Sequence, residues 1–282
     1  MMTSIRGRAA CLARIGRGSC VAIQRDAYTR FSISGVLLDT FEAIGRNFSV
    51  FAALAALAEI PNVAFHILSA TVTTSATGLE ISLAHVISLS GLGIVEALVA
   101  FASSCIAQGA LSLGTVAELN GKRASLPDCL SASVKSLSSL LGISILATLG
   151  LLGGLLLLVV PGVVLALGWA VAVPVCVIER KSVFESFRRS WYLTSGHRLT
   201  IFGMVALAAV GLLIFLLIVL SLSSILANAA GGGAGPLILY IFQLIVEIAT
   251  AVFSGSLMGA IYYELYVIKE GHAPGAQASV FD

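Results

Sequence analysis

Three glutamates, Glu59, Glu96 and Glu247, stand in stretches of the chain that are otherwise apolar. A charged acid at the centre of a bilayer costs at least about 2.5–3.5 kcal/mol on insertion scales, so such side chains face a bundle interior or a wet cavity. Counted along helices that rise about 1.5 Å per residue, the three acids fall in one layer and can share one cavity. The neutral polar residues that we expect beside them are Asn62, Gln108 and Gln243.

Two interpretations of these acids stay open. In the first, they form a binding site for a proton, a cation or an amine. In the second, they are protonated carboxyl groups that hydrogen-bond between helices and serve only structure, since burial favours the neutral form of an acid. Replacement by glutamine separates the two, because a structural hydrogen bond largely tolerates the change and a cation site does not.

The elements that position these acids must be membrane-spanning helices. The chain has 282 residues, of which 58% are hydrophobic and 11% charged, with a mean hydropathy of +1.03. Soluble domains carry about 25% charged residues, whereas an apolar stretch of about 20 residues spans a bilayer as a helix. We therefore predict an all-α, polytopic membrane protein with six spans, at about residues 48–70, 92–116, 137–160, 162–178, 199–227 and 237–268.

The distribution of basic residues predicts the orientation. When the connections between spans are assigned alternately to two sides, all 16 Lys and Arg residues fall on the side that holds both termini. The positive-inside rule then places both termini in the cytoplasm, and we expect a bacterial inner-membrane protein. The predicted domains are an Arg-rich cytoplasmic tail (1–34), a six-span membrane domain (35–270) and a cytoplasmic C-terminal tail (271–282).

Residues 179–198 form a charged island between two apolar spans. Ser182 and Glu185 have the spacing of a helical capping box, and Val183, Phe184, Phe187 and Trp191 fall on one arc of a helix. These features predict an amphipathic helix at the membrane interface, with cations towards lipid phosphates; the alternative is a solvated loop. The residues expected at this interface are Arg180, Lys181, Phe184, Phe187, Arg188, Arg189, Trp191, His197 and Arg198, with Lys122, Arg123 and Lys135 from other connections on the same side.

Fainter copies of the island precede two other spans. Ser125 and Asp128 repeat the cap before the third span, and residues 39–46 resemble a weaker copy before the first. We therefore predict a pseudo-threefold repeat, each unit being an interfacial helix followed by a transmembrane hairpin. Ala251, Gly255 and Gly259 have the small-residue spacing that lets helix backbones approach closely, either within the bundle or between protomers.

Enzymatic signatures are weak by comparison. The five cysteines lack the spacing of a metal site or a disulfide framework, so we expect no metal and no cofactor. We find no nucleophile–base arrangement, no nucleotide fingerprint and no nucleic-acid signature in the sequence.

Motifs between residues 161 and 264 resemble those of a known family, at Pro161, Gly162, Trp169, Pro174, Glu179, Ser190, Gly196, Tyr263 and Glu264. They are similar to the six-span membrane domain found before the catalytic domain of some bacterial glycerophosphodiester phosphodiesterases, and to related stand-alone membrane proteins, over about residues 35–270. In those enzymes the hydrolytic chemistry belongs to a separate barrel domain, which these 282 residues do not show, so the resemblance implies a membrane protein and no phosphodiesterase activity.

The sequence thus favours a non-enzymatic inner-membrane protein that engages anionic lipid headgroups or a protein partner, as a scaffold or accessory factor in envelope homeostasis; a homo-oligomer is compatible with this. The alternative is a small transporter or channel whose site includes Glu59, Glu96 and Glu247. An intramembrane lipid-modifying enzyme is a third and weaker reading, because no catalytic pair stands out.

Overall fold

The computed structural model of the protein describes residues 31–74, 83–157 and 159–274, and every regular element in these ranges is an α-helix. The helices are α3 (Ile33–Arg46), α4 (Phe48–Thr74), α5 (Leu83–Leu119), α6 (Leu126–Lys135), α7 (Leu137–Leu157), α8 (Val159–Trp169), α9 (Ala172–Glu179), α10 (Val183–Thr194) and α11 (Arg198–Glu270).

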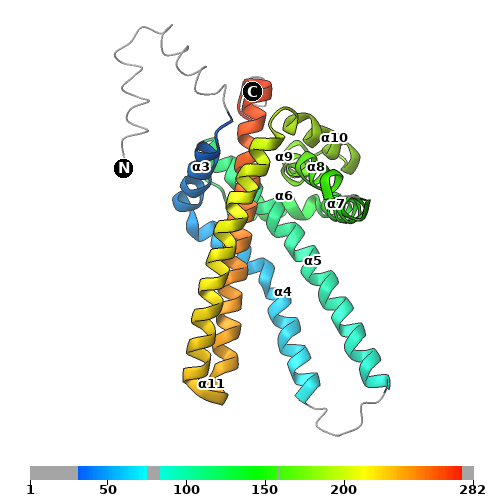
Figure 1. Cartoon of the computed structure of the whole chain (residues 1–282), viewed down its shortest axis with the longest axis vertical. Helices are drawn as coiled ribbons and strands as arrows, with labels where there is room; N and C mark the ends of the chain where they lie inside the picture. The colour runs from blue at the N-terminus through cyan, green and yellow to red at the C-terminus, as the bar shows by residue number, and fades with distance from the viewer. Residues whose placement is uncertain (1–30, 75–82, 158, 275–282) are drawn as a thin grey trace.

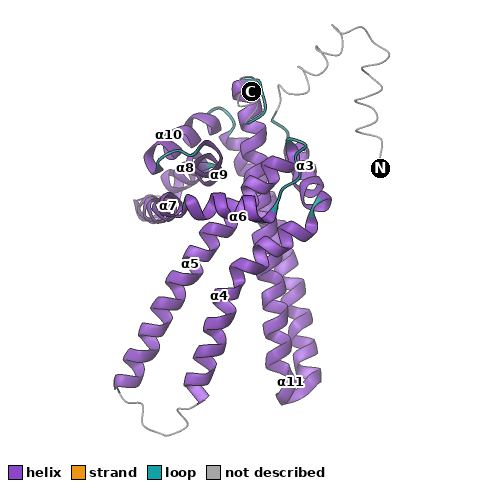
Figure 2. Ribbon diagram, turned by 180° about the vertical axis from the view of Figure 1, so that it is seen from behind, coloured by secondary structure: helices purple, strands orange, loops and turns teal. Residues whose placement is uncertain are grey.

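The longest helix, α11, is a hairpin of two arms. Its backbone leaves the helical conformation at Gly231, where φ is 75° and ψ is −178°. Glycine tolerates this positive φ because it has no Cβ. The two arms lie side by side in both views (Figures 1 and 2). We expected a turn across residues 229–236, but the chain reverses at Gly231 and is helical again directly after it.

The helices do not form a bundle of parallel rods. In Figure 1, α4 and α5 follow the long axis of the molecule with α11 but diverge from one another towards the lower end. Helix α7 is seen almost end-on both there and in Figure 2, so it runs across that axis. The short helices α3, α6, α9 and α10 gather at the end where α11 starts and finishes.

Five helical segments in the described part of the chain are long and apolar enough to cross a membrane, or six if α3 and the start of α4 are taken as one span bent by 87°. The prediction of an all-helical protein with several spans is therefore confirmed. The five segments are Gly93–Leu119, Leu137–Gly154, Val160–Glu179, Arg198–Gly231 and Leu237–Glu270.

A short helix precedes each pair of long ones, as α3, α6 and α10. Two of the three start where we expected: Ser125 accepts a hydrogen bond from the Asp128 amide, and Ser182 with Glu185 forms the capping box. The third start was wrong. Ser32, rather than Asp39, caps α3, so Asp39 lies in the middle of that helix. The threefold repeat itself stays a prediction.

Helices α7 and α8 form a tight hairpin between the third and fourth predicted spans, but Pro161 and Gly162, which we expected to form the turn, lie inside α8. Helix α8 already begins at Val159, which places Pro161 in its first turn, where the missing N–H of proline costs no helical bond. A Cβ atom added to Gly154 would lie 2.7 Å from the Cα of Gly162, so glycine is needed where the two helices touch.

The second arm of α11 packs on α5 through its small residues. A Cβ atom on Gly255 would lie 2.6 Å from the Cβ of Leu111, and one on Gly259 would lie 2.8 Å from the carbonyl oxygen of Ser112. Ala251 packs beside them against the cluster around Phe51. The small-residue motif therefore mediates a contact within one chain.

Candidate functional site

Two regions collect the polar residues singled out by the sequence, and the first is a cavity between the spans. It has a volume of about 170 Å³ and is bounded by α4, α5 and the second arm of α11. We call it the acidic cavity. Its lining residues are Asn62, Val63, Glu96, Ala100, Tyr240, Gln243, Leu244 and Glu247.

Hydrogen bonds order the polar side chains around the acidic cavity. Asn62 Nδ2 donates to Glu59 Oε2 over 2.8 Å, which places Glu59 directly behind the lining. Gln243 Nε2 donates to Glu247 Oε1 over 3.0 Å. The other amide atom of Asn62, Oδ1, is buried and has no hydrogen-bond partner. The structure therefore brings together three acids and two amides from three segments that lie far apart in the chain.

One predicted member of this set lies elsewhere. Gln108 donates from Nε2 to Ser254 Oγ over 2.9 Å and so ties α5 to α11, and it does not line the acidic cavity. Tyr240 lines the cavity and was missed. Its spacing of three from Gln243 and seven from Glu247 puts it on the same helix face, which is the signal that would have identified it.

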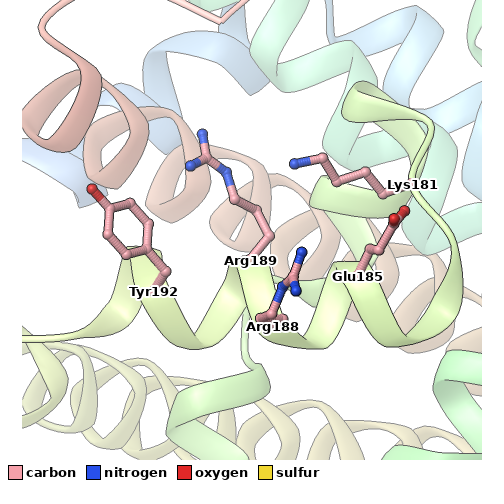
Figure 3. A pocket seen from close by; sticks show the side chains of 5 residues that line it. All are labelled: Lys181, Glu185, Arg188, Arg189 and Tyr192. Atoms are coloured by element: carbon pink, nitrogen blue, oxygen red, sulfur yellow. The ribbon is translucent and has the colours of Figure 1, made fainter.

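The second region is a groove on the outer side of α10, with a volume of about 490 Å³. We call it the basic groove. In Figure 3 the amino group of Lys181 and the guanidinium of Arg189 point towards the same space, with Tyr192 at one end. The residues that line it are Lys181, Glu185, Arg188, Arg189 and Tyr192.

Helix α10 begins with the predicted capping box. The Ser182 amide donates to Glu185 Oε2 over 3.3 Å, while the Ser182 side chain accepts from the backbone at Glu185. The hydrogen bonds to Ser182 lower the pKa of Glu185 from its ordinary value, and the charges of Arg188 and Lys181 act in the same direction. Glu185 is therefore an anion at the rim of an otherwise cationic groove.

Arg189 holds α10 to two other helices. The Arg189 Nε atom lies 3.2 Å from Glu179 Oε1, and its Nη2 atom lies 2.7 Å from Glu270 Oε1. Burial lowers the pKa of Arg189, but the hydrogen bond to Glu270 and the charge of Glu179 raise it, and the net direction is upward. Glu179 also lies 2.8 Å from Lys181 Nζ and accepts from the Tyr262 hydroxyl over 3.1 Å.

Several predicted interface residues are surface-accessible. Phe184 is 76% exposed, and Trp191 is 37% exposed with the Arg198 guanidinium 3.8 Å from its ring centroid. The other exposed members are Arg180, Arg188, Lys122, Arg123 and Lys135.

One of them was wrongly placed. Phe187 is buried, with its ring 4.6 Å from that of Trp169. The buried face of α10 is centred on Phe187, Ser190 and Leu193, so the helix lies with this face on protein. The aromatic residues that we placed on one arc of the helix therefore lie on different faces of α10, since Phe187 packs inwards and Phe184 faces outwards. His197 is half-buried beside the Phe31 ring, and burial and the charge of Lys269 lower its pKa.

Several positions that carry the family resemblance make contacts at the end of the molecule where α11 starts and finishes. Ser190 Oγ donates to the Gly168 carbonyl over 2.8 Å, and the Trp191 ring lies against Gly168. Pro174 is buried in α9. Gly196 has a φ of 88°, which lets the chain turn from α10 into α11. Tyr263 and Glu264 are half-buried near the end of α11, next to Tyr262, which makes the contact with Glu179.

The family comparison agrees with these motifs. Residues 140–279 match the family model described as the membrane domain of glycerophosphoryl diester phosphodiesterase. Every motif position from Pro161 to Glu264 lies inside this match, which starts about 100 residues later in the chain than the resemblance that we drew from the sequence. No curated protein and no solved structure matches the chain.

Proposed function

We propose that this chain binds anionic lipid headgroups at its basic end, the end where α11 starts and finishes and where the basic groove lies. Residues 140–279 of the chain form a membrane domain of the glycerophosphoryl diester phosphodiesterase family. In this proposal it is a bacterial inner-membrane protein that acts without catalysis, as a scaffold or accessory factor in envelope homeostasis. Its basic end faces the cytoplasm, where the positive-inside rule places Lys and Arg.

The observation that carries the proposal is the convergence of three cations on the basic groove. Lys181, Arg188 and Arg189 line it together with Tyr192. Phosphate oxygens accept several hydrogen bonds at once, and guanidinium groups present paired donors that match them. Arg189 is already paired with Glu179 and Glu270, which fixes its position, whereas Arg188 is exposed. Arg188 is therefore the cation that we assign to the headgroup.

The surroundings of the basic groove suit a membrane interface. Phe184 is exposed on the same helix, and Trp191 is partly exposed. Aromatic side chains are enriched where acyl chains meet headgroups, and cations nearby gain about 1 kcal/mol each from an anionic surface.

Titration of the purified full chain with a soluble short-chain lipid tests the proposal. In a neutral detergent, dihexanoyl phosphatidylglycerol should bind more tightly than dihexanoyl phosphatidylcholine, which has the same chains but no net charge. Arg188→Glu should weaken phosphatidylglycerol binding about tenfold, because it reverses one charge in the groove. Arg188→Lys keeps the positive charge at the same position and should weaken the binding less than Arg188→Glu does. Equal binding of the two lipids by the unaltered chain would refute the proposal.

A second candidate function, a small transporter or channel, is favoured by the acidic cavity. Glu96 on α5 and Gln243 and Glu247 on the second arm of α11 line one space between these helices. Flux of a cation into proteoliposomes, lost in Glu247→Gln but kept in Arg188→Glu, would separate this function from lipid engagement.

A further inference from the structure

We propose that the hairpin of α7 and α8 lies along the membrane instead of crossing it, and that its outer half contacts the acyl chains of the leaflet next to the basic groove. The inference does not rest on headgroup binding in that groove. The basic residues of the sequence do not distinguish the two arrangements, because a hairpin that stays in one leaflet and a pair of spans both return the chain to the side from which it came.

The longest helices give the direction of the membrane. The two candidate spans of α11 have 34 residues each, or about 50 Å of helix, and the hydrocarbon layer is about 30 Å thick. Helices α4 and α5 follow the same long axis in Figure 1, so this axis is the one along which the chain crosses the bilayer. Helix α7 runs across that axis, and in both views it lies nearer to the start and finish of α11 than to its bend (Figures 1 and 2). Helices in two such different directions do not all cross one flat bilayer.

The contact between α7 and α5 shows the same crossing. Ser144, in the first half of α7, has its Oγ 3.2 Å from the Sγ of Cys105 on α5. Beyond this contact the two helices separate, since Leu149 on α7 and both Ile94 and Leu98 on α5 are exposed. Two neighbouring helices that span a bilayer together touch along much of their length, whereas helices that cross steeply touch at one place.

Contacts with the rest of the basic end fix the hairpin in this direction. A Cβ atom added to Gly142 would lie 2.9 Å from the side chain of Val183, at the start of α10. On α8, the Gly168 carbonyl accepts a hydrogen bond of 2.8 Å from Ser190 Oγ of α10. Helix α10 therefore covers one side of the hairpin. A rotation of α7 onto α5 would break these contacts, so the hairpin is held across the long axis by steric fit.

The uncovered part of the hairpin needs hydrocarbon around it. Residues 149–168 contain no polar side chain. Leu149, Leu152 and Leu156 are 62%, 59% and 92% exposed. A helix that lies among headgroups has a polar face, whereas one that is apolar all round belongs below them. Lys135 precedes α7 and Arg180 follows α9, and both are exposed, which places cations at headgroup level at the base of the hairpin. The acyl chains of this one leaflet are therefore the surroundings that fit it.

The depth of single labels in liposomes tests the inference. In a cysteine-free full chain, Leu149→Cys, Leu152→Cys and Leu156→Cys each carry an environment-sensitive fluorophore, which phosphatidylcholines with a nitroxide at known depths quench. These three positions share one helix face. We expect one common depth for all three. A spanning α7 would instead place them at three different depths, over about 10 Å of helix rise.

The first arm of α11 provides the matched control. Val210→Cys, Leu213→Cys and Leu217→Cys have the same spacing, also replace exposed residues, and lie as far from the start of their helix as the α7 positions do from theirs. They should show three different depths. The same spread of depths in α7 would overturn the inference. A single depth in both series would overturn it too, because α11 would then not mark the direction of crossing.

Side-specific labelling gives a second test at the tip of the hairpin. Ala230→Cys lies at the bend of α11, and a membrane-impermeant maleimide should reach it from one side of the membrane. Leu156→Cys should stay unlabelled from that side. Labelling of both residues from the same side would show that the hairpin crosses the bilayer, whichever way the protein is oriented, and would overturn the inference.

Discussion

The hydroxyl of Tyr262 donates a hydrogen bond of 3.1 Å to Glu179 Oε1, across 83 residues of chain. Tyr262 is fully buried, and Glu179 ends α9. Through Arg189, the same carboxylate reaches α10. One acid therefore joins three helices at the basic end, which gives a structural reason for the family motif position at Glu179.

Loss of the Tyr262 hydroxyl should destabilise this junction. We expect Tyr262→Phe to lower the free energy of unfolding by about 1.5 kcal/mol, because a buried acceptor loses one of its donors while the ring still packs. Denaturation of the purified chain in mixed micelles measures this. Tyr192→Phe removes a hydroxyl from a half-exposed ring and should change stability by less than about 0.5 kcal/mol. Equal effects of the two variants would contradict the assigned role.

Removal of the Arg189 guanidinium should cost more. Arg189→Ala leaves Glu179 with Lys181 and takes the guanidinium from Glu270, and because these groups are only partly buried we expect a loss of about 2 kcal/mol, between the values for exposed and buried ion pairs. The same unfolding measurement applies. Arg188→Ala is the matched control, since that side chain is exposed and adjacent in sequence. A loss of similar size in the control would show that the effect is not due to the ion pairs.

Close packing of α11 on α5 predicts a strong response to added methyl groups. Gly259→Ala should destabilise the protein by about 1–3 kcal/mol, because the new Cβ would lie 2.8 Å from a backbone oxygen of α5. Gly211→Ala adds the same atom to the other arm, where nothing lies within 4 Å, and should be neutral or slightly stabilising. The melting temperature should therefore fall clearly in Gly259→Ala and stay the same or rise slightly in Gly211→Ala.

The His197 environment predicts weaker folding in mild acid. Burial and the charge of Lys269 lower the pKa of His197 from its ordinary value of 6.5, so below that pH the unfolded chain binds a proton more readily than the folded one. The free energy of unfolding should therefore fall as the pH drops below about 6.5, and the stabilisation is complete above it. Glu185, whose pKa is lowered from 4.5, stays ionised throughout this range.

Thermal melts at pH 8, 6.5 and 5 check this dependence. His197→Gln should make the melting temperature less sensitive to pH between 6.5 and 5. An unchanged slope in this variant would assign the pH dependence to other groups.

The predicted orientation can be read by cysteine labelling. In a cysteine-free background, Ala230→Cys should react with a membrane-impermeant maleimide on intact spheroplasts, because it lies at the bend of α11. Lys122→Cys should react only after the membrane is permeabilised, because it lies between α5 and α6 at the basic end. The reverse pattern would invert the orientation and remove the basic groove from the cytoplasmic side.

Features that depend on neighbours along the chain could be predicted. Ser182 and Glu185 form their capping box within one helical turn, so local chemistry was sufficient. Glu118 shows the limit. It ends a long apolar helix and is buried, where it accepts from Asn47 Nδ2 and the Ala124 amide. Those partners lie in the connections between α3 and α4 and between α5 and α6, so its role as a buried acceptor could not be read from the apolar pattern.

The sequence alone determined that the chain is helical, that it carries several apolar spans and that its cations cluster in the connections, because chain length, hydropathy and caps are properties of short segments. Tertiary structure decided which polar groups meet. The contact of Gly255 and Gly259 with α5 fixes how each helix is rotated about its own axis. That rotation brings Tyr240 to the acidic cavity and leaves Gln108 at a helix contact. On α10, Phe187 turns inwards and packs against Trp169. Rotation is set by steric fit between distant segments, and a single span shows that its small residues can pack closely but not which segment they pack against.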